Sequence, residues 1–376
     1  MNYILSDNGL HLRFAPLTLT RPLGTVRIGI MTNEERIKLF DKTATIYFET
    51  ESYLTTKFPA KNNAQDDIVI NAQVILTATL MNAISQLNAD ETLVHNDTWI
   101  AKKGVGAKSI QFNDTVLIIN QRWEIFQKND VALEFDFEWI TKGRTTQQIS
   151  ATNTVIGNIN RIFLEEGASV EASILNTTSG SIYLAKNAEI MEGSVVRGGL
   201  ALGESAALKL ATKVYGATTL GQHCKVGGEV NNVVFQAYSN KGHDGFLGNA
   251  LIGEWCNLGA DTNCSNLKNN YSNVTTYSYE TQQQEKTNVQ FMGLVMGDHS
   301  KCGINTMFNT ATVCGVSCNV YGGDFPPKFI PSFSWGGSDG FEKFTLEKAI
   351  QAAQAMMNRR HIDFTDGDRK IFEELF

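Results

Sequence analysis

The sequence predicts a parallel β-helix that follows an α/β domain and precedes a helical C-terminus. Two regularities carry this prediction: an aliphatic residue recurs at every sixth position, and a small residue follows most of these anchors by four positions. An α-helix would spread every sixth residue around its circumference and a simple strand alternates every two, so period six requires short strands joined by tight corners. Three such strands form one coil, and the anchors point inward and stack into a continuous core. The anchors are Leu184, Ile190, Val196, Leu202, Leu208, Val214, Leu220 and Val226, and the small residues are Ala188, Ser194, Ala206, Thr212, Thr218 and Cys224.

Three segments resemble known enzymes. The hexapeptide pattern is that of the left-handed β-helix of hexapeptide-repeat acyltransferases. Residues 240–266, NKGHDGFLGNALIGEWCNLGADTNCSN, resemble the acetyltransferase half of the bacterial bifunctional glucosamine-1-phosphate N-acetyltransferase and N-acetylglucosamine-1-phosphate uridyltransferase family. Residues 13–24, RFAPLTLTRPLG, resemble the start of a sugar nucleotidyltransferase. The resemblance implies a short form of that family: an α/β nucleotidyltransferase-like domain, a left-handed parallel β-helix and C-terminal helices.

Composition indicates an ordinary soluble chain of two to three domains. The length is 376 residues, 42% are hydrophobic and only 19% are charged, with a formal net charge of −7. No basic stripe points to nucleic acid. No apolar run approaches membrane-spanning length, and the chain starts with the strand-like Tyr3-Ile4-Leu5 rather than a leader segment. We therefore expect a cytoplasmic protein without a membrane or nucleic-acid partner.

All six cysteines lie in the repeat region. The pairs Cys256 with Cys264 and Cys314 with Cys318 lack the two-residue spacing that is usual for zinc sites, and a disulfide framework is unusual in so long a chain. We expect free thiols that fill interior or corner positions. No metal site is predicted in the repeats.

Residues 1–150 read as a shortened nucleotidyltransferase-like α/β domain. The family resemblance places Arg13 and Arg21 in the nucleotide-binding segment, whereas Leu23 stands where the family has a lysine and Gln73 where it has the metal-binding aspartate. Nucleotidyl transfer needs Mg²⁺ and cations around the phosphates. The domain is therefore either still active, with Mg²⁺ and UTP, or a degenerate domain that binds a nucleotide or only supports assembly, with both arginines as surface residues.

The rest of this domain gives coarser signals. We expect an amphipathic helix over 75–87 and a buried strand over 115–120. The aromatic segments 122–126 and 135–140 are expected to pack at a domain junction, and the polar stretch 141–153 is the expected linker.

The β-helix is expected over 151–325, with strands starting near Thr154. Leu164 and Val170 are earlier anchors, a longer corner falls near 176–181, and the repeats resume at Ile252 and Leu258. The span allows roughly eight or nine coils and a prism about 40 Å tall. Two interruptions are expected: a short one at 239–246 that carries the chemistry, and a polar excursion at 269–288.

His243 is the expected catalytic residue. In the resembling acetyltransferases, the histidine of this segment is the general base that takes a proton from the sugar amine, and Phe246 replaces a tyrosine. An imidazole suits this task because it is mostly neutral, yet basic enough to accept a proton, near neutral pH.

The same resemblance implies the remaining site residues. Ala260 falls where a backbone amide approaches the acetyl-CoA donor, and a serine that contacts the coenzyme is replaced by Ile304. The lysines could hold a phosphate or be ordinary surface residues. The predicted substrate-binding residues are Lys213, Asn231, Lys241, Phe246, Asn257 and Asn266.

Residues 326–376 are expected to form a strap and two helices. The segment DFPPKFIPSFSWGG would cover the last coil, so that its edge does not recruit another chain. Thr345 would cap a helix whose buried face holds Leu346, Ile350, Ala353 and Met357, and a second helix would follow over 363–376.

The sequence thus predicts an acetyl-CoA-dependent N-acetyltransferase acting on an amino-sugar phosphate, with glucosamine-1-phosphate as the expected acceptor. A uridylyltransferase and a non-catalytic nucleotide-binding scaffold are the alternatives. Because the interior of the prism is filled, a site for sugar and coenzyme must lie outside it. We therefore expect a homotrimer with active sites between subunits.

Overall fold

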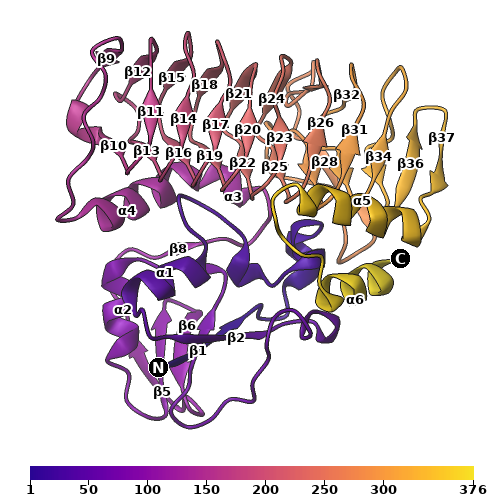
Figure 1. Ribbon diagram of the computed structural model, residues 1–376. Coiled ribbons are helices and arrows are strands. Elements are labelled where there is room, and N and C mark those ends of the chain that lie inside the picture. The colour runs from indigo at the N-terminus through magenta and orange to yellow at the C-terminus, as the bar shows by residue number, and fades with distance from the viewer.

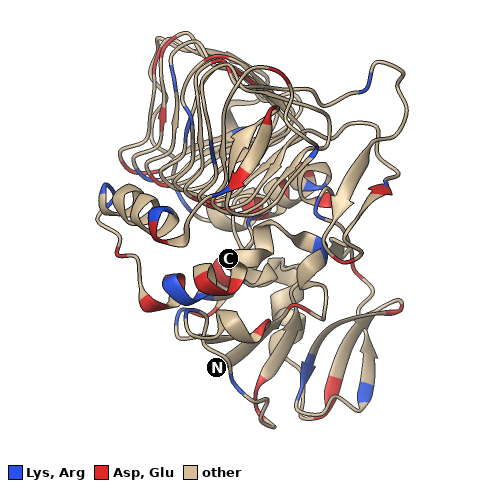
Figure 2. Ribbon diagram, turned by 90° about the vertical axis from the view of Figure 1, so that its right-hand side faces the viewer, with Lys and Arg blue, Asp and Glu red and all other residues tan.

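The computed structural model describes residues 1–376 and confirms the predicted fold class (Figure 1). A left-handed parallel β-helix forms a prism, the N-terminal α/β part lies along one of its sides, and two C-terminal helices lie beside the last coils. Figure 2 looks along the prism and shows its three-sided outline, with the N-terminal part below. None of the helices is long and apolar enough to cross a membrane.

The N-terminal part is built on a six-stranded sheet of order β2-β1-β3-β6-β5-β7. Helices α1 (Asn33–Phe40) and α2 (Ala78–Ser85) pack on it through a shared apolar cluster. The predicted first strand and the helix expected over 75–87 are confirmed. The strands are β1 (Asn2–Ser6), β2 (Thr45–Glu49), β3 (Ile68–Asn71), β5 (Glu91–His95), β6 (Thr98–Lys103) and β7 (Lys108–Gln111).

Two segments of this part are less regular than expected. The strand expected over 115–120 is only β8 (Leu117–Ile118), half-buried and paired with β4 (Val74–Ile75). The loop after β1 contains three 3₁₀ helices, η1 (His11–Phe14), η2 (Leu17–Thr20) and η3 (Leu23–Thr25), and a fourth, η4 (Ser52–Leu54), follows β2.

The prism has three parallel sheets, one per side. The side that bears the N-terminal part, which we term the covered face, has nine strands, and the open face has eight. The α5 face, named after helix α5 (Leu346–Asn358), has ten strands including a final antiparallel one. The covered face holds β10 (Ile162–Leu164), β13 (Ile182–Leu184), β16 (Leu200–Leu202), β19 (Thr218–Leu220), β22 (Val234–Phe235), β25 (Leu251–Ile252), β30 (Val295–Met296), β33 (Val313–Cys314) and β35 (Phe329–Ile330).

The other two faces follow the same coil-by-coil order. The open face holds β9 (Thr154–Ile156), β12 (Ile174–Asn176), β15 (Val195–Arg197), β18 (Lys213–Tyr215), β21 (Glu229–Asn231), β24 (Phe246–Gly248), β27 (Asn263–Cys264) and β32 (Met307–Phe308). The α5 face holds β11 (Ser169–Val170), β14 (Glu189–Ile190), β17 (Ala207–Leu208), β20 (Lys225–Val226), β23 (Asn240–Lys241), β26 (Asn257–Leu258), β31 (Lys301–Cys302), β34 (Asn319–Val320), β36 (Ser334–Gly337) and β37 (Gly340–Lys343).

The predicted anchors form the core of the prism. All eight, and all six of the small residues, are at most 2% exposed. The longer corner is confirmed, because five residues, 177–181, separate β12 from β13. The interruption expected at 239–246 is wrong: β23 and β24 continue the coil, and Lys241 lies in register with the anchor Val226. Residues 242–245 form a four-residue corner of the ordinary length, like 209–212 and 259–262, whereas Gly227 and Gly228 form a shorter corner one coil earlier.

The six cysteines are all free and buried, as predicted. Burial raises the pKa of the Cys224 and Cys264 thiols to about 12. Neutral thiols therefore serve as small apolar fillers inside the coils.

One corner column, between the covered face and the α5 face, stacks aromatic rings. His223, Tyr238, Trp255 and His299 occupy equivalent corners of four successive coils, and each has a positive φ of 53° to 61°. Ring centroids lie 5.4, 4.1 and 6.2 Å apart along the column, with the rings nearly parallel. Ring pairs of this kind contribute about 1 kcal/mol each, which offsets part of the backbone strain at these corners.

The N-terminal part and the prism share one core. An 18-residue cluster joins Phe14, Leu17 and Ile125 to Val234 and Leu251 of the covered face. The aromatic segments expected at a junction form α3 (Glu124–Gln127) and α4 (Asn129–Thr141), and α4 packs on the covered face. The stretch 141–153 then leads to β9.

The expected excursion is the hairpin of β28 (Thr275–Ser278) and β29 (Gln283–Lys286). It reaches the N-terminal part, where Arg122 donates to the main-chain oxygen of Tyr277 and to the hydroxyl of Thr276.

The C-terminal segment differs from the expected strap, because β35 and β36 add strands to the prism and β37 folds back antiparallel on β36. Two helices follow, α5 (Leu346–Asn358) and α6 (Asp366–Leu375). Thr345 is the N-cap residue of α5, but its side chain makes no capping hydrogen bond, and Leu346 is only half-buried.

Candidate functional site

His243 lies on the corner that joins the α5 face to the open face. Its side chain is exposed and makes no hydrogen bond within the chain. The corner holds four residues, as do the corners 209–212 and 259–262 of the same column, whereas the corner 227–228 one coil earlier is shorter. In the next coil, the N–H of Asp261 donates to the main-chain oxygen of Asp244 at 3.1 Å, which places Ala260 beside the His243 corner.

Lys241 holds this corner from inside the prism. Its side chain is fully buried, and its Nζ donates to the main-chain oxygens of Gly227 (3.2 Å), His243 (2.8 Å) and Asp244 (3.2 Å). Burial lowers the pKa of Lys241 to about 8. The N–H donors of Lys241 are thus all used by main-chain oxygens, and the side chain cannot reach the phosphate that it was predicted to bind. Lys241 is instead a positioning residue for His243.

The open face carries the other polar groups next to this corner. Lys213, Glu229 and Phe246 follow one another in register on adjacent strands and all point outward. Tyr215 donates to Glu229 at 2.6 Å, and this hydrogen bond raises the pKa of Tyr215 to about 12, so its hydroxyl stays protonated. A hollow of about 560 Å³ lies over Arg197, Lys213, Tyr215 and Glu229.

Neighbouring residues fix the position of Phe246. The N–H of Phe246 donates to Oδ1 of Asn263 at 2.8 Å. A Cβ on Gly248 would come within 2.7 Å of the ring and 2.6 Å of the Asn266 amide nitrogen, so only glycine leaves room for both. Phe246 and Asn266, two predicted substrate-binding residues, are therefore brought together around Gly248.

Asn231 lies at the opposite edge of the open face, beside a hollow rich in amides. Asn231, Asn232, Asn249, Asn288 and Gln290 line this hollow of about 610 Å³. Asn266 donates to Oδ1 of Asn249 at 2.8 Å, which joins it to the same group. Amide side chains can both donate to and accept from sugar hydroxyls.

Asn257 does not lie with these residues. It is on the α5 face, in register with Asn240, and lines a separate hollow of about 380 Å³. A single chain therefore divides the predicted substrate-binding residues between two sides of the prism.

Arg13 and Arg21 are both engaged by carboxylates of the repeat region. Arg21 is buried and bonds to Glu254 at 2.6 Å and to Asp298, whereas Arg13 makes two hydrogen bonds with Glu280 of the hairpin, at 3.0 and 3.1 Å. The structure thus places both arginines at contacts between the two parts of the molecule. Their role in nucleotide binding stays a prediction.

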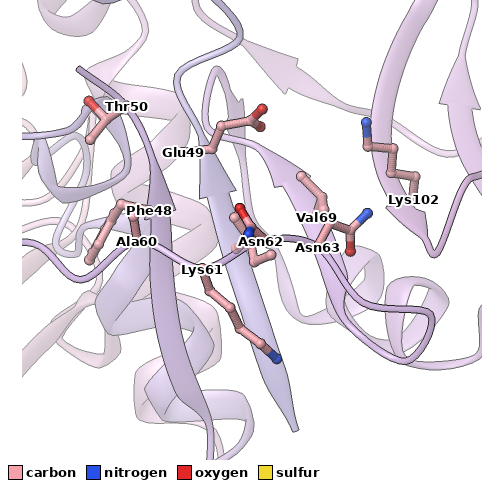
Figure 3. Close-up of a pocket in the computed structure, with 10 residues that line it drawn as sticks. Phe48, Glu49, Thr50, Ala60, Lys61, Asn62, Asn63, Val69 and Lys102 are labelled. Atoms are coloured by element: carbon pink, nitrogen blue, oxygen red, sulfur yellow. The ribbon is translucent and has the colours of Figure 1, made fainter. Parts of the chain in front are cut away.

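The N-terminal part has its own hollow, of about 460 Å³, over the sheet (Figure 3). Lys61 and Lys102 flank it, with Asn62 and Asn63 between them in Figure 3. Lys61 is already paired with Asp67 at 2.7 Å. No group of three or more His, Cys, Asp or Glu side chains is arranged to hold a metal ion.

Sequence reasoning missed several residues of the open face. Arg197, Tyr215 and Asn263 were not singled out, although each lies one residue before or after an inward-pointing position. That offset was the available signal, because residues next to an anchor on a short strand point outward.

Comparisons with known proteins divide the chain in the same way. Residues 3–145 match the family model described as sugar nucleotidyl transferase. No curated protein matches the chain in sequence. The chain therefore joins a segment like the sugar nucleotidyl transferases to a left-handed β-helix.

Among solved structures, the polySia-specific acetyltransferase NeuO is 10% identical, with coverage of 56% of this chain and 100% of that chain at a TM-score of 0.34. An Arabidopsis UDP-N-acetylglucosamine acyltransferase is 12% identical (58% and 78% coverage, TM-score 0.24). The polysialic acid O-acetyltransferase OatWY is 13% identical (53% and 89% coverage, TM-score 0.20). Likenesses this distant carry no argument about activity.

Proposed function

We propose that this protein is an acetyl-CoA-dependent N-acetyltransferase of an amino-sugar phosphate, with glucosamine-1-phosphate as the expected acceptor, in the synthesis of UDP-N-acetylglucosamine. The observation that carries the proposal is the His243 corner. An exposed imidazole stands at the edge of an outward face with cationic, aromatic and amide groups, and a buried lysine fixes its main chain.

The reaction follows from these groups. The sugar amine attacks the thioester carbon, the C–S bond breaks, and the CoA thiolate leaves. His243 takes the proton that the amine loses and returns it to the thiolate. Main-chain N–H groups at the corners would stabilise the oxyanion that forms in between. Lys213 and Arg197 suit the sugar phosphate as cations, and Phe246 and Asn231 suit the sugar.

A homotrimer would complete the site. Sheet-to-sheet contact fits the open face, because no other part of the chain packs on its outward apolar residues Ile174 (39% exposed), Val195 (42%) and Met307 (37%). Leu210 (64%) and Ile304 (70%), on the same corner column as His243, extend this apolar surface. A closed three-fold arrangement would cover it and place His243 of one subunit near a neighbour.

The test is an assay of CoA release with the full chain, acetyl-CoA and a panel of amino-sugar phosphates. His243→Asn removes the base and keeps a polar side chain on the corner, so kcat should fall by about 10²- to 10⁴-fold. His95→Asn, a histidine substitution in the distant N-terminal sheet, is the matched control and should leave kcat unchanged. Equal rates for His243→Asn and the wild type would contradict the assignment.

A second candidate activity is uridylyl transfer by the N-terminal part, which the family match over residues 3–145 favours. Leu23 and Gln73 replace the expected lysine and aspartate, and Gln73 donates to the oxygens of Ile119 and Asn120. We therefore expect little Mg²⁺-dependent release of pyrophosphate from UTP. Nucleotide binding without turnover would indicate the third alternative, a non-catalytic scaffold.

A further inference from the structure

Four cations surround one hollow on the α5 face. Lys225 and Lys301 point outward from β20 and β31, and Asn240 and Asn257 lie in register between them. Arg359 and Arg360, at the end of α5, form the other wall. The hollow measures about 380 Å³, and no Asp or Glu is among its lining residues.

These cations lack carboxylate partners. None of the four takes part in an ion pair of the structure. Glu254, on the adjacent corner, is already paired with Arg21. In a chain with a net charge of −7, four cations without a carboxylate partner create a local field that attracts anions, although Nζ of Lys301 already donates to the main-chain oxygen of His299 at 2.9 Å.

A polar atom of one lining residue is also unsatisfied. Oδ1 of Asn240 is buried and has no hydrogen-bond partner. Buried polar atoms are almost always bonded, so an orphan of this kind needs an explanation. Because an amide oxygen only accepts, a donor on a ligand, such as a hydroxyl group, would satisfy it, whereas a phosphate oxygen would not.

The helix end alone does not account for this arrangement. Cations near a helix C-terminus complement its dipole, which would explain Arg359 and Arg360. It would not explain why Lys225 and Lys301, from strands three positions apart in the sheet, line the same hollow. At about 4.8 Å per strand, these two lysines are attached roughly 14 Å apart, a span that suits an elongated anion.

We propose that this hollow binds the diphosphate or triphosphate group of a nucleotide-type ligand. Guanidinium groups pair with phosphate oxygens through two N–H donors, and lysines add point charges at either end. Asn240 and Asn257 supply amide donors between the cations. The inference stands on the hollow alone and does not depend on acetyl transfer at His243.

Calorimetric titration of the full chain with inorganic pyrophosphate tests the proposal. Arg359→Ala with Arg360→Ala should weaken binding by at least about tenfold, since the two guanidinium groups would make charge-assisted hydrogen bonds to phosphate oxygens. Lys225→Ala, a surface substitution on another element, should weaken it in the same direction. Arg369→Ala with Lys370→Ala removes two adjacent cations from α6 and is the matched control, which should bind as the wild type does.

Parallel titrations with CoA and UTP distinguish the sources of the phosphate group. The Arg359 and Arg360 variant should bind pyrophosphate more weakly than the wild type does. Whichever of CoA and UTP it also binds more weakly is the ligand of this hollow. His243→Asn should bind pyrophosphate normally, which separates this site from the proposed acetyl transfer. No binding of pyrophosphate to the wild type, or equal loss in the α6 control, would overturn the proposal. Unchanged melting temperatures would show that the variants are folded.

Discussion

Nζ of Lys241 lies 2.8 Å from the main-chain oxygen of His243, although the first side chain is fully buried and the second is exposed. The lysine replaces an aliphatic anchor and bonds from the core to the corner that carries the expected base. The interior of the prism thus fixes the backbone of a surface residue.

Replacing this lysine should impair acetyl transfer without touching substrate. Lys241→Met keeps the length of the side chain but removes all three hydrogen bonds to the corner. We expect kcat to fall by about 10- to 100-fold with KM nearly unchanged, because small displacements of a catalytic group are costly. Lys186→Met, on an exposed corner, is the control. A Lys241→Met enzyme with wild-type kcat would show that the corner holds its shape without the lysine.

The effect of Lys241 on the free energy of unfolding should change with pH in the alkaline range. Burial lowers the pKa of Lys241 from 10.5 to about 8. Below pH 8 the side chain is therefore charged in the folded and in the unfolded protein, and the folded protein bears the full free-energy cost of burying the ammonium group. Between about pH 8 and 10.5 the folded protein has released the proton and the unfolded chain still holds it, so the free energy of unfolding rises with pH.

Urea unfolding of the wild type and Lys241→Met at pH 7 and pH 10 measures this effect. The wild-type value minus the variant value should increase by about 2.5 kcal/mol, since pH 10 lies about two units above the folded pKa and one unit corresponds to about 1.36 kcal/mol. Taking the difference cancels the titration of all other groups. A difference that is independent of pH would contradict the buried ammonium.

The six cysteine thiols should be unreactive in the folded protein. Burial raises the pKa of Cys224 and Cys264 to about 12, so their stabilising contribution is complete below the ordinary value of 9 and is lost as pH rises toward 12. Because all six side chains are buried, a thiol reagent at pH 8 should modify the native chain very slowly and modify all six cysteines in guanidinium. Rapid native reaction of even one cysteine would show that a coil opens readily.

Arg21 should matter far more for stability than Arg13. Arg21→Met leaves the buried Asp298 and half-buried Glu254 without their cation, which should cost about 3 to 5 kcal/mol of unfolding free energy. Arg13→Met breaks a pair that is about one-third exposed and should cost at most about 1 kcal/mol. Urea midpoints for the two variants give the comparison, and equal midpoints would refute it.

The proposed trimer predicts a molecular mass of about 125 kDa in light scattering, three times the 41.5 kDa of one chain. Val195→Asp and Ile174→Asp place charges in the apolar surface of the open face and should yield monomers with little acetyl transfer. Ile159→Asp, at an exposed aliphatic residue of a 3₁₀ turn, is the control. A monomeric wild type with full activity would exclude both the assembly and a shared site.

The prism was predictable because inward positions tolerate few residue types and repeat at a fixed period. After Val226 the spacing between inward-pointing residues falls below six, at Val230 and Phe235, and the sequence pattern is lost. The next inward-pointing residue is Lys241, which its residue type suggested was on the surface. The sequence could not indicate the pairing of Arg21 with Asp298, 277 residues away, or the division of Asn257 and Phe246 between two faces. Such relations depend on how coils stack and parts dock, which no local pattern records.

The common core beneath the covered face has a consequence for how this protein can be taken apart. Phe14, Leu17 and Ile125 are fully buried against strands that lie more than a hundred residues further along the chain, so a fragment of residues 1–150 would expose them to water. Such a fragment should aggregate, and a prism alone should carry a matching apolar stripe. The polypeptide should then melt as a single cooperative unit, and loss of the first half, even where its chemistry is gone, would require new polar residues on the covered face of the second.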